Sequence, residues 1–354
     1  MTFFHKLNVK QVHLIILIVL SLIINLFFLS FNLGYKNFYS GLISAHGEIG
    51  CNFYKYNSIK LNPKQSGYVS SFSKEGELVD YGVVKNKDFG KPTIFRDVND
   101  TIGYGVLLGL IWKITGSLKY RDVQILQVII FSFLMILFYF IVYMIFASYN
   151  FAFLCSCLLL CFYPLIYLNV QPLRDIWGYY GLIILLFALL RFFKFNMRMG
   201  WLIICGIFFA LCQYIRPTIF FNLLLILPVF GYFFRNEKIK LLKAFSVFFV
   251  SNLLFFWVPF MTYNKIAYNH YFVSCSGHGL LAGLGQFKNK WEIKLDDGSV
   301  ASVVHRQFGF KGGTVDYNKG AKKIFYEYVK DDPIYFCKTI LYRFPSLFVL
   351  TVIV

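Results

Sequence analysis

Acidic residues are scarce in this chain and are confined to two parts of it. The sequence has 17 Asp and Glu against 35 Lys and Arg, and only Asp175 and Glu237 lie outside residues 31–122 and 264–343. The residues between these stretches are almost uninterrupted apolar sequence. Nearly all carboxylate chemistry is therefore restricted to two regions, which are the candidate functional loops.

Charge is also missing from the middle of the long apolar runs. No Asp, Glu, Lys, Arg or His lies at the centre of any of them. Ion-coupled transporters usually carry such residues there as proton or ion relays. This absence argues against a pump or a secondary transporter.

Support for nucleic-acid or metal binding is lacking as well. The net charge is +18, but no basic stretch is both free of the apolar runs and long enough to form a groove, so we expect no nucleic-acid partner. Cys155, Cys157 and Cys161 lie in an apolar run without a neighbouring His or acid, which predicts small hydrophobic residues. We assign no residue as a metal ligand.

Apolar residues dominate what remains. The chain is 58% hydrophobic and 21% aromatic, with 43 Phe, which predicts an all-α polytopic integral membrane protein. A membrane-crossing helix needs about 20 apolar residues. The predicted spans are residues 12–31, 123–147, 151–170, 176–193, 200–215, 217–234 and 244–263.

Residues 101–116 are apolar but short, and they contain Lys113. If they do not cross the membrane, nine basic residues share the cytoplasmic side, as the positive-inside rule requires, and only Arg174 and Arg216 lie in short outer turns. If they cross, two internal basic clusters move outside. We therefore predict an amphipathic helix in the outer interface, with both long loops on the outer face.

The predicted organisation has five parts. They are an N-terminal tail and uncleaved anchor (1–31), a first extracytoplasmic loop (32–122), a six-helix transmembrane bundle (123–263), a second extracytoplasmic loop (264–343) and the start of a further helix (344–354). Alternating segments at 67–72 and 78–84 predict a small β-hairpin in the first loop. The last apolar run is too short to cross, so we expect it to continue in a longer native chain.

Three segments resemble motifs of one enzyme superfamily. They are FRDVNDTIGYGVLLGLIWKITG (95–116), LCQYIRPT (211–218) and DDPIYFCKTILYR (331–343). Together with the order of anchor, outer loop, interfacial helix and bundle, they resemble the GT-C membrane glycosyltransferases, which include protein O-mannosyltransferases and lipid A aminoarabinose transferases. Two features depart from that pattern: the usual prolines before the interfacial helix are missing, and the first acid after the first span is Glu48.

The resemblance implies transfer of a sugar from a polyprenyl-phosphate carrier to a lipid, glycan or protein acceptor on the outer face. The acceptor hydroxyl must lose a proton, so a carboxylate base is needed. Glu48 is the first candidate, with an ordinary solvated acid as the alternative. Asp97 and Asp100 are the others, although Asp100 also suits an N-cap. A divalent cation held by these two aspartates stays open, because some members of the superfamily use one.

The leaving lipid phosphate needs positive charge around it. Arg216 lies in an outer turn at the expected level of the phosphate, with snorkelling as the alternative. Arg174 is a second candidate, unless it pairs with Asp175 beside it. Arg96 is a third, and His278 in the glycine-rich segment 276–285 is a candidate for substrate contact.

Two other functions compete with the transferase. A flippase or transporter for lipid-linked glycans would need a polar path that the spans do not show. A non-catalytic membrane subunit of a glycan assembly complex would tolerate replacement of the three acids. The bias toward Lys, Asn, Ile and Phe is typical of an AT-rich bacterial genome, so we expect a multi-pass protein of the bacterial inner membrane, with its N-terminus cytoplasmic and membrane lipids around it.

Overall fold

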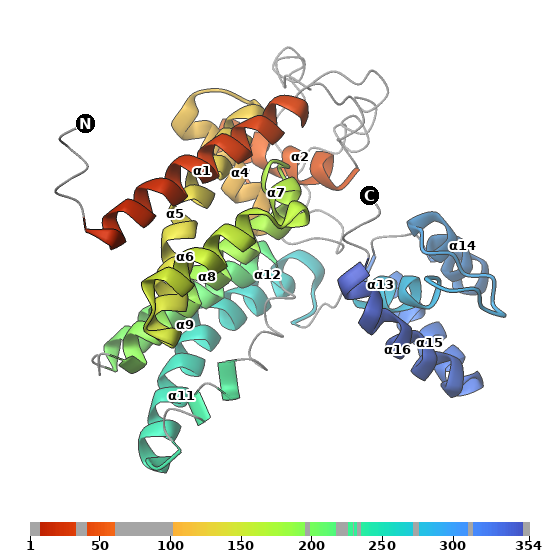
Figure 1. Ribbon diagram of the computed structural model, residues 1–354. Helices are drawn as coiled ribbons and strands as arrows, with labels where there is room; N and C mark the ends of the chain where they lie inside the picture. Colours follow the sequence, from red (N-terminus) through yellow and green to blue (C-terminus); the bar gives the residue numbers. More distant parts are fainter. Residues whose placement is uncertain are drawn as a thin grey trace. The chain divides into compact units, whose positions relative to one another are not determined.

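The computed structural model describes residues 8–32, 41–60, 102–194, 199–216, 226–228, 230–231, 235–271, 276–310 and 314–349. Within these residues every regular element is a helix, which confirms the all-α class (Figure 1). The chain divides into two units, and the boundary in the described part lies between Pro259 and Phe260. The predicted hairpin segments lie outside the described residues.

The first unit contains most of the apolar helices. Its described helices are α1 (Val9–Asn32), α2 (Gly41–Tyr56), α4 (Ile102–Thr115), α5 (Tyr120–Phe146), α6 (Tyr149–Leu160), α7 (Tyr163–Asn169), α8 (Arg174–Lys194), α9 (Gly200–Ile215), α11 (Lys238–Asn252) and the π-helical turn η4 (Leu253–Trp257). Helix α12 (Val258–Tyr268) continues from η4 across the unit boundary.

Four of these helices are long and apolar enough to cross a membrane. They are α1, α5, α8 and the continuous helix Lys238–Tyr268, which is made of α11, η4 and α12. The predicted spans 12–31, 123–147 and 176–193 match the first three to within a few residues. The predicted span 200–215 is a shorter apolar helix, and most of 217–234 lies outside the described residues. The finding supports a multi-pass membrane protein.

The predicted span 151–170 is not one straight helix. It is divided into α6 and α7, which meet at an angle of 67° as a broken span or a re-entrant loop. Pro164 lies in the first turn of α7, where its missing N–H is tolerated, but it cannot continue the hydrogen bonds of α6. Counting this pair as one span gives up to five.

Helix α1 shows how the first unit meets lipid. Ile16, Val19, Ile23 and Phe27 recur at helical spacing, and each is at least 43% exposed. The opposite face buries Leu17 against Phe131 and other residues of α5 to α8. A continuous apolar stripe of this kind would promote aggregation in water and is stable against acyl chains.

The π-helical turn η4 has a local cause. Pro259 has no N–H to donate to the carbonyl of Phe255, four residues earlier. The hydroxyl of Tyr214 in α9 donates to the carbonyls of Phe255 (3.1 Å) and Phe256 (3.2 Å) instead. These hydrogen bonds give the carbonyls of the irregular turn a side-chain donor inside an apolar environment.

Neutral polar side chains join α1, α5, α7 and α8 inside the first unit. Ser132 donates to the hydroxyl of Ser21 (3.1 Å), and Asn25 donates to the Ser21 carbonyl (2.8 Å). Asn169 donates to Asn25, and Tyr180 donates to Asn169. Each span contributes only one or two of these residues, so the network arises from packing and was not predicted.

The second unit is helical where a loop was predicted. It contains α13 (Ser276–Leu284), α14 (Asp297–Phe308), α15 (Val315–Asp331) and α16 (Pro333–Val349). Leu281, Val300, Tyr317 and Ile324 are at most 1% exposed and form its core. Helix α16 begins at Pro333, where the N-cap Asp332 accepts from Tyr335 N (2.8 Å), and so starts before the apolar run expected to begin near residue 344.

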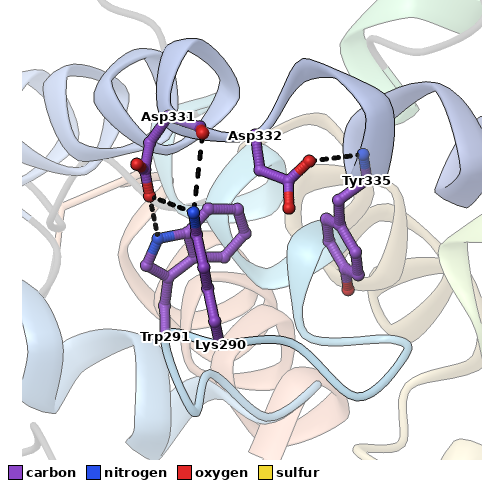
Figure 2. Close-up of polar contacts among 5 residues, drawn as sticks. All are labelled: Lys290, Trp291, Asp331, Asp332 and Tyr335. Carbon is purple, nitrogen blue, oxygen red and sulfur yellow. Dashed lines mark hydrogen bonds and ion pairs between the residues drawn. The ribbon is translucent and has the colours of Figure 1, made fainter.

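Charged and aromatic groups fasten the end of α15 to the segment between α13 and α14 (Figure 2). The Asp331 carboxylate lies 2.7 Å from Lys290 Nζ and accepts from Trp291 Nε1 at 3.0 Å. Tyr335 donates its hydroxyl to the Leu284 carbonyl (2.8 Å). The hydrogen bonds from Lys290 and Trp291 hold the pKa of Asp331 below its ordinary value of 3.8.

Candidate functional site

Helices α2 and α4 pack against each other through glycines. A Cβ atom on Gly50 would lie 2.7 Å from the Trp112 ring, and one on Gly105 would lie 2.6 Å from Ile49 Cβ. A Cβ on Gly109 would lie 2.7 Å from the Gly50 carbonyl oxygen. The two backbones can approach this closely only because these positions lack side chains. The packing fixes α2 on α4.

Helix α4 is held in turn on the end of α9. A Cβ on Gly103 would lie 2.2 Å from the Tyr214 carbonyl oxygen, so the first turn of α4 touches the last turn of α9 directly. Tyr104 is 1% exposed and donates its hydroxyl to the Pro172 carbonyl at 2.6 Å. Helix α4 thus contacts both α9 and the turn between α7 and α8.

Two arginines lie at this end of the unit. Arg174 begins α8 and donates from Nη1 to Nε2 of His46 in α2 at 3.4 Å. Arg216 caps the end of α9, and its Nη2 lies 2.9 Å from Asp175 Oδ1. The Arg216 and Asp175 side chains are 32% and 36% exposed, so the pair is partly open to solvent. The His46 ring packs edge-on against Tyr104, with centroids 5.2 Å apart.

The cluster of His46, Arg174, Asp175 and Arg216 is called the arginine site below. It contains two guanidinium groups and one carboxylate. Partly exposed guanidinium groups suit a phosphate or another oxyanion. The arrangement can therefore bind an anion at the end of the helical unit.

The predicted site residues have different outcomes. Arg174 and Arg216 come together in the arginine site. The link is Asp175, which follows Arg174 at the start of α8 and pairs with Arg216. The alternative that Arg174 pairs with Asp175 is not what the structure describes, since Asp175 contacts Arg216 across two helices. Glu48 lies in α2, two residues after His46.

The other predicted residues lie elsewhere or outside the described part. Arg96, Asp97 and Asp100 are outside the described residues, and so is any cation that the two aspartates would hold. His278 belongs to the second unit, where its Nδ1 lies 2.6 Å from the Tyr317 hydroxyl. Across the described ranges, no group of three or more His, Cys, Asp or Glu could hold a metal ion.

Two residues of the site, and Tyr104 beside it, were not predicted as site residues from the sequence. His46, Tyr104 and Asp175 acquire their places through contacts between α2, α4, α8 and α9. The glycines at 105 and 109 were a usable signal, because they lie four residues apart and indicate a helix face that packs closely on another helix.

Comparisons with protein-family models, with curated proteins and with solved structures found no match to this chain.

Proposed function

We propose that this protein is a membrane glycosyltransferase that takes a sugar from a polyprenyl-phosphate carrier and transfers it to a lipid, glycan or protein acceptor on the outer face. The arginine site carries the proposal. Its two partly exposed guanidinium groups lie at the end of a unit whose α1, α5 and α8 are long and apolar enough to cross the membrane. The phosphate of a membrane lipid would lie at this level.

The chemistry assigns distinct roles to the charged groups. The acceptor oxygen forms a bond to the anomeric carbon while the bond from that carbon to the phosphate oxygen breaks. The acceptor proton passes to a carboxylate, and the lipid phosphate leaves with its charge stabilised by Arg174 and Arg216. A single displacement of this kind inverts the anomeric carbon.

Glu48 is the favoured base among the three predicted acids. It lies in α2, the helix that supplies His46 to the arginine site, and α2 is fixed by close packing on α4. Asp97 and Asp100 precede α4 in the chain and are the alternatives. Arg96 is a further candidate for the phosphate, and a divalent cation held by the aspartates is an optional aid.

Helix α4 suits a position in the outer interface. Leu110 is 45% exposed and Ile114 is 85% exposed, while Tyr104, Leu108 and Trp112 are buried against the rest of the unit. An apolar helix of 14 residues is too short to cross and can rest at the level of the headgroups. In this position it would guide a long lipid carrier toward the arginine site.

The test is transfer of radiolabelled sugar from polyprenyl-phosphate donors in native membranes. We expect Glu48→Gln to lower the rate by about a hundredfold or more, as removal of a general base does. Asp97→Asn and Asp100→Asn test the alternatives. Glu327→Gln, an exposed acid of α15, is the matched control and should keep the wild-type rate.

Each outcome decides something. If the wild type transfers sugar and all three acid variants keep the rate, the base assignment is wrong. If the wild type consumes no donor in whole native membranes, the transferase is wrong and a non-catalytic subunit of an assembly complex becomes the better account.

A flippase for lipid-linked glycans is the second candidate. The chain of neutral polar side chains through α1, α5, α7 and α8 favours it, because polar groups inside a membrane unit can line the route of a polar headgroup. Movement of an intact donor across proteoliposomes, with no bond broken, would identify this function.

A further inference from the structure

Four glutamines lie buried at the same end of the first unit as the arginine site. Gln124 and Gln127 are in the first turns of α5, Gln171 follows α7, and Gln213 is in the last turn of α9. Their exposed fractions are between 0% and 5%. We call these four residues the amide belt.

The hydrogen bonds of the amide belt are incomplete. Gln124 Nε2 donates to the Val170 carbonyl (2.8 Å), and Gln127 Nε2 donates to the Gln171 carbonyl (2.9 Å). Among the described residues, the Oε1 atoms of both side chains and the Nε2 atom of Gln171 have no hydrogen-bond partner. Buried amides are normally paired, so unpaired ones point to a bound molecule.

Gln213 is the extreme member of the amide belt. It is 0% exposed, and within the described part of the chain neither its Oε1 nor its Nε2 atom has a partner. The indole Nε1 of Trp177, one turn into α8, is also buried and unpaired there. Trp177 packs against Tyr180, with centroids 5.5 Å apart, and Tyr180 donates to the Gln127 carbonyl (3.2 Å).

The unpaired atoms define which chemical groups a bound molecule would need. They include acceptors (Gln124, Gln127 and Gln213 Oε1) and donors (Gln171 and Gln213 Nε2, Trp177 Nε1), and all belong to neutral groups. A hydroxyl both donates and accepts, so several hydroxyls on one ligand match this mixture. An ammonium or carboxylate on the ligand would be buried without an opposite charge among these groups, which is unfavourable.

The spacing in the chain joins the amide belt to the arginine site. Gln171 precedes Arg174 by three residues, and Gln213 precedes Arg216 by three residues. In each segment a neutral amide is followed by a guanidinium group: Gln171 lies in the turn before α8, which Arg174 begins, and Gln213 lies in the last turn of α9, which Arg216 caps. A sugar phosphate has a matching arrangement, with a neutral, hydroxyl-rich part next to a charged phosphate.

We infer that the amide belt binds the sugar of the lipid-linked donor and selects an uncharged, hydroxyl-rich sugar over an amino sugar or a uronic acid. This inference rests on the proposed function, because the phosphate next to the sugar is assigned to the arginine site. It adds the substrate class and four binding residues.

Binding to the purified full chain in lipid nanodiscs tests the inference without requiring turnover. The probes are polyprenyl phosphate, and polyprenyl phosphate carrying a neutral hexose, an amino sugar or a uronic acid. We expect the neutral hexose to raise affinity about tenfold over polyprenyl phosphate alone, as a few neutral hydrogen bonds would. The two charged sugars should give no such gain.

The variants separate the sugar from the phosphate. Gln213→Leu should abolish the tenfold gain and keep the affinity for polyprenyl phosphate within about twofold. Gln213→Glu should transfer the preference to the amino sugar, by supplying the charge that it needs. The matched control is Asn252→Leu, because Asn252 is 1% exposed and its amide atoms also have no partner among the described residues, but it lies at the end of α11.

The outcomes are distinct from those of the transferase test. Equal affinity for neutral and charged sugars overturns the inference, as does a Gln213→Leu variant that is folded and keeps the gain, in which case the belt holds only water. If neutral sugar is selected but no transfer occurs in membranes, the transferase fails and the sugar site stands. If no probe binds, both the site and the inference fail.

Discussion

The two units of the molecule treat their buried polar groups differently. In the second unit, Asn318 is 3% exposed and donates to the Thr314 carbonyl (3.2 Å), and Thr339 is 2% exposed and donates to the Phe336 carbonyl (2.7 Å). In the first unit, Gln213 and Gln171 are as deeply buried and keep atoms that have no partner among the described residues. An unpaired buried group costs about 1–3 kcal/mol, and the hydrogen bonds of Asn318 and Thr339 avoid that cost.

This difference separates stability from function. Helices α13 to α16 of the second unit have an apolar core, and the buried Asn318 is hydrogen-bonded beside it, which is the pattern of an element built for its own stability. The first unit keeps guanidinium groups at one end, together with buried amides that have atoms without a partner among the described residues. Substitutions in the two units should therefore change different observables.

The largest expected effect lies in the core of the second unit. Ile324 is 0% exposed, and Ile324→Ala should destabilise this unit by about 3 kcal/mol, because it leaves a cavity. Amide hydrogen exchange of α13 to α15 should become faster, while affinity for polyprenyl phosphate should not change. Tyr326→Ala, on the exposed side of the same helix, is the control. Equal protection in both variants would contradict the assigned core.

The next effect concerns the packing that positions the site in the first unit. Gly103→Ala should destabilise the contact of α4 with α9 by about 2 kcal/mol, because the new methyl group would meet the Tyr214 backbone. Thermal unfolding in nanodiscs measures the change. Gly200→Ala in α9, where a Cβ meets nothing within 4 Å, should be neutral or slightly stabilising. A Gly103→Ala protein as stable as Gly200→Ala would show that the contact is absent.

A smaller effect, in the opposite direction, should follow from Asp175→Asn. Asp175 neutralises Arg216 at 2.9 Å and would compete with a phosphate for it. Removing the charge of Asp175 should increase the affinity for polyprenyl phosphate about fivefold, or ~1 kcal/mol, as expected for a partly exposed ion pair. Titration of polyprenyl phosphate measures this. Weaker binding would mean that Asp175 orients Arg216 and does not compete.

The smallest effect is expected in the second unit and depends on pH. The pKa of Asp331 is lowered in the folded state, so its contacts with Lys290 and Trp291 stabilise the fold above 3.8, the ordinary pKa. This contribution is lost as the pH falls through the lower, folded-state pKa. Asp331→Asn should be less stable than the wild type at pH 7, and the two should converge in acid. A difference that is constant with pH would exclude the ionised carboxylate as its source.

The sequence was sufficient for the long spans. Continuous apolar runs predicted α1, α5 and α8, because a bilayer imposes their length and composition. The helix predicted at 101–116 is present as α4 (Ile102–Thr115), and its interfacial position stays a prediction. The break at Pro164 was available in the sequence and was missed, because the apolar run continues through it.

The remaining elements depend on contacts that a single sequence does not display. The sequence of helix α2 contains glycines and residues of mixed polarity, and it was therefore predicted to be part of a loop. Its packing on α4 stabilises it as a helix. Arg216 and Asp175 are 41 positions apart in the numbering and meet only because α8 and α9 pack together. The amide belt was missed for the same reason. Its role depends on burial, and a single sequence does not show whether a glutamine is exposed in a loop or buried in a core.

The most direct test of this account is the affinity of the purified protein for polyprenyl phosphate, measured for the wild type, Arg216→Gln and Arg306→Gln. Both substitutions remove one guanidinium group, but Arg306 is exposed on α14 of the second unit. Loss of a charge-assisted contact should weaken binding about thirtyfold in Arg216→Gln, while Arg306→Gln binds like the wild type. Equal affinities in the two variants would contradict a phosphate site at the end of the first unit.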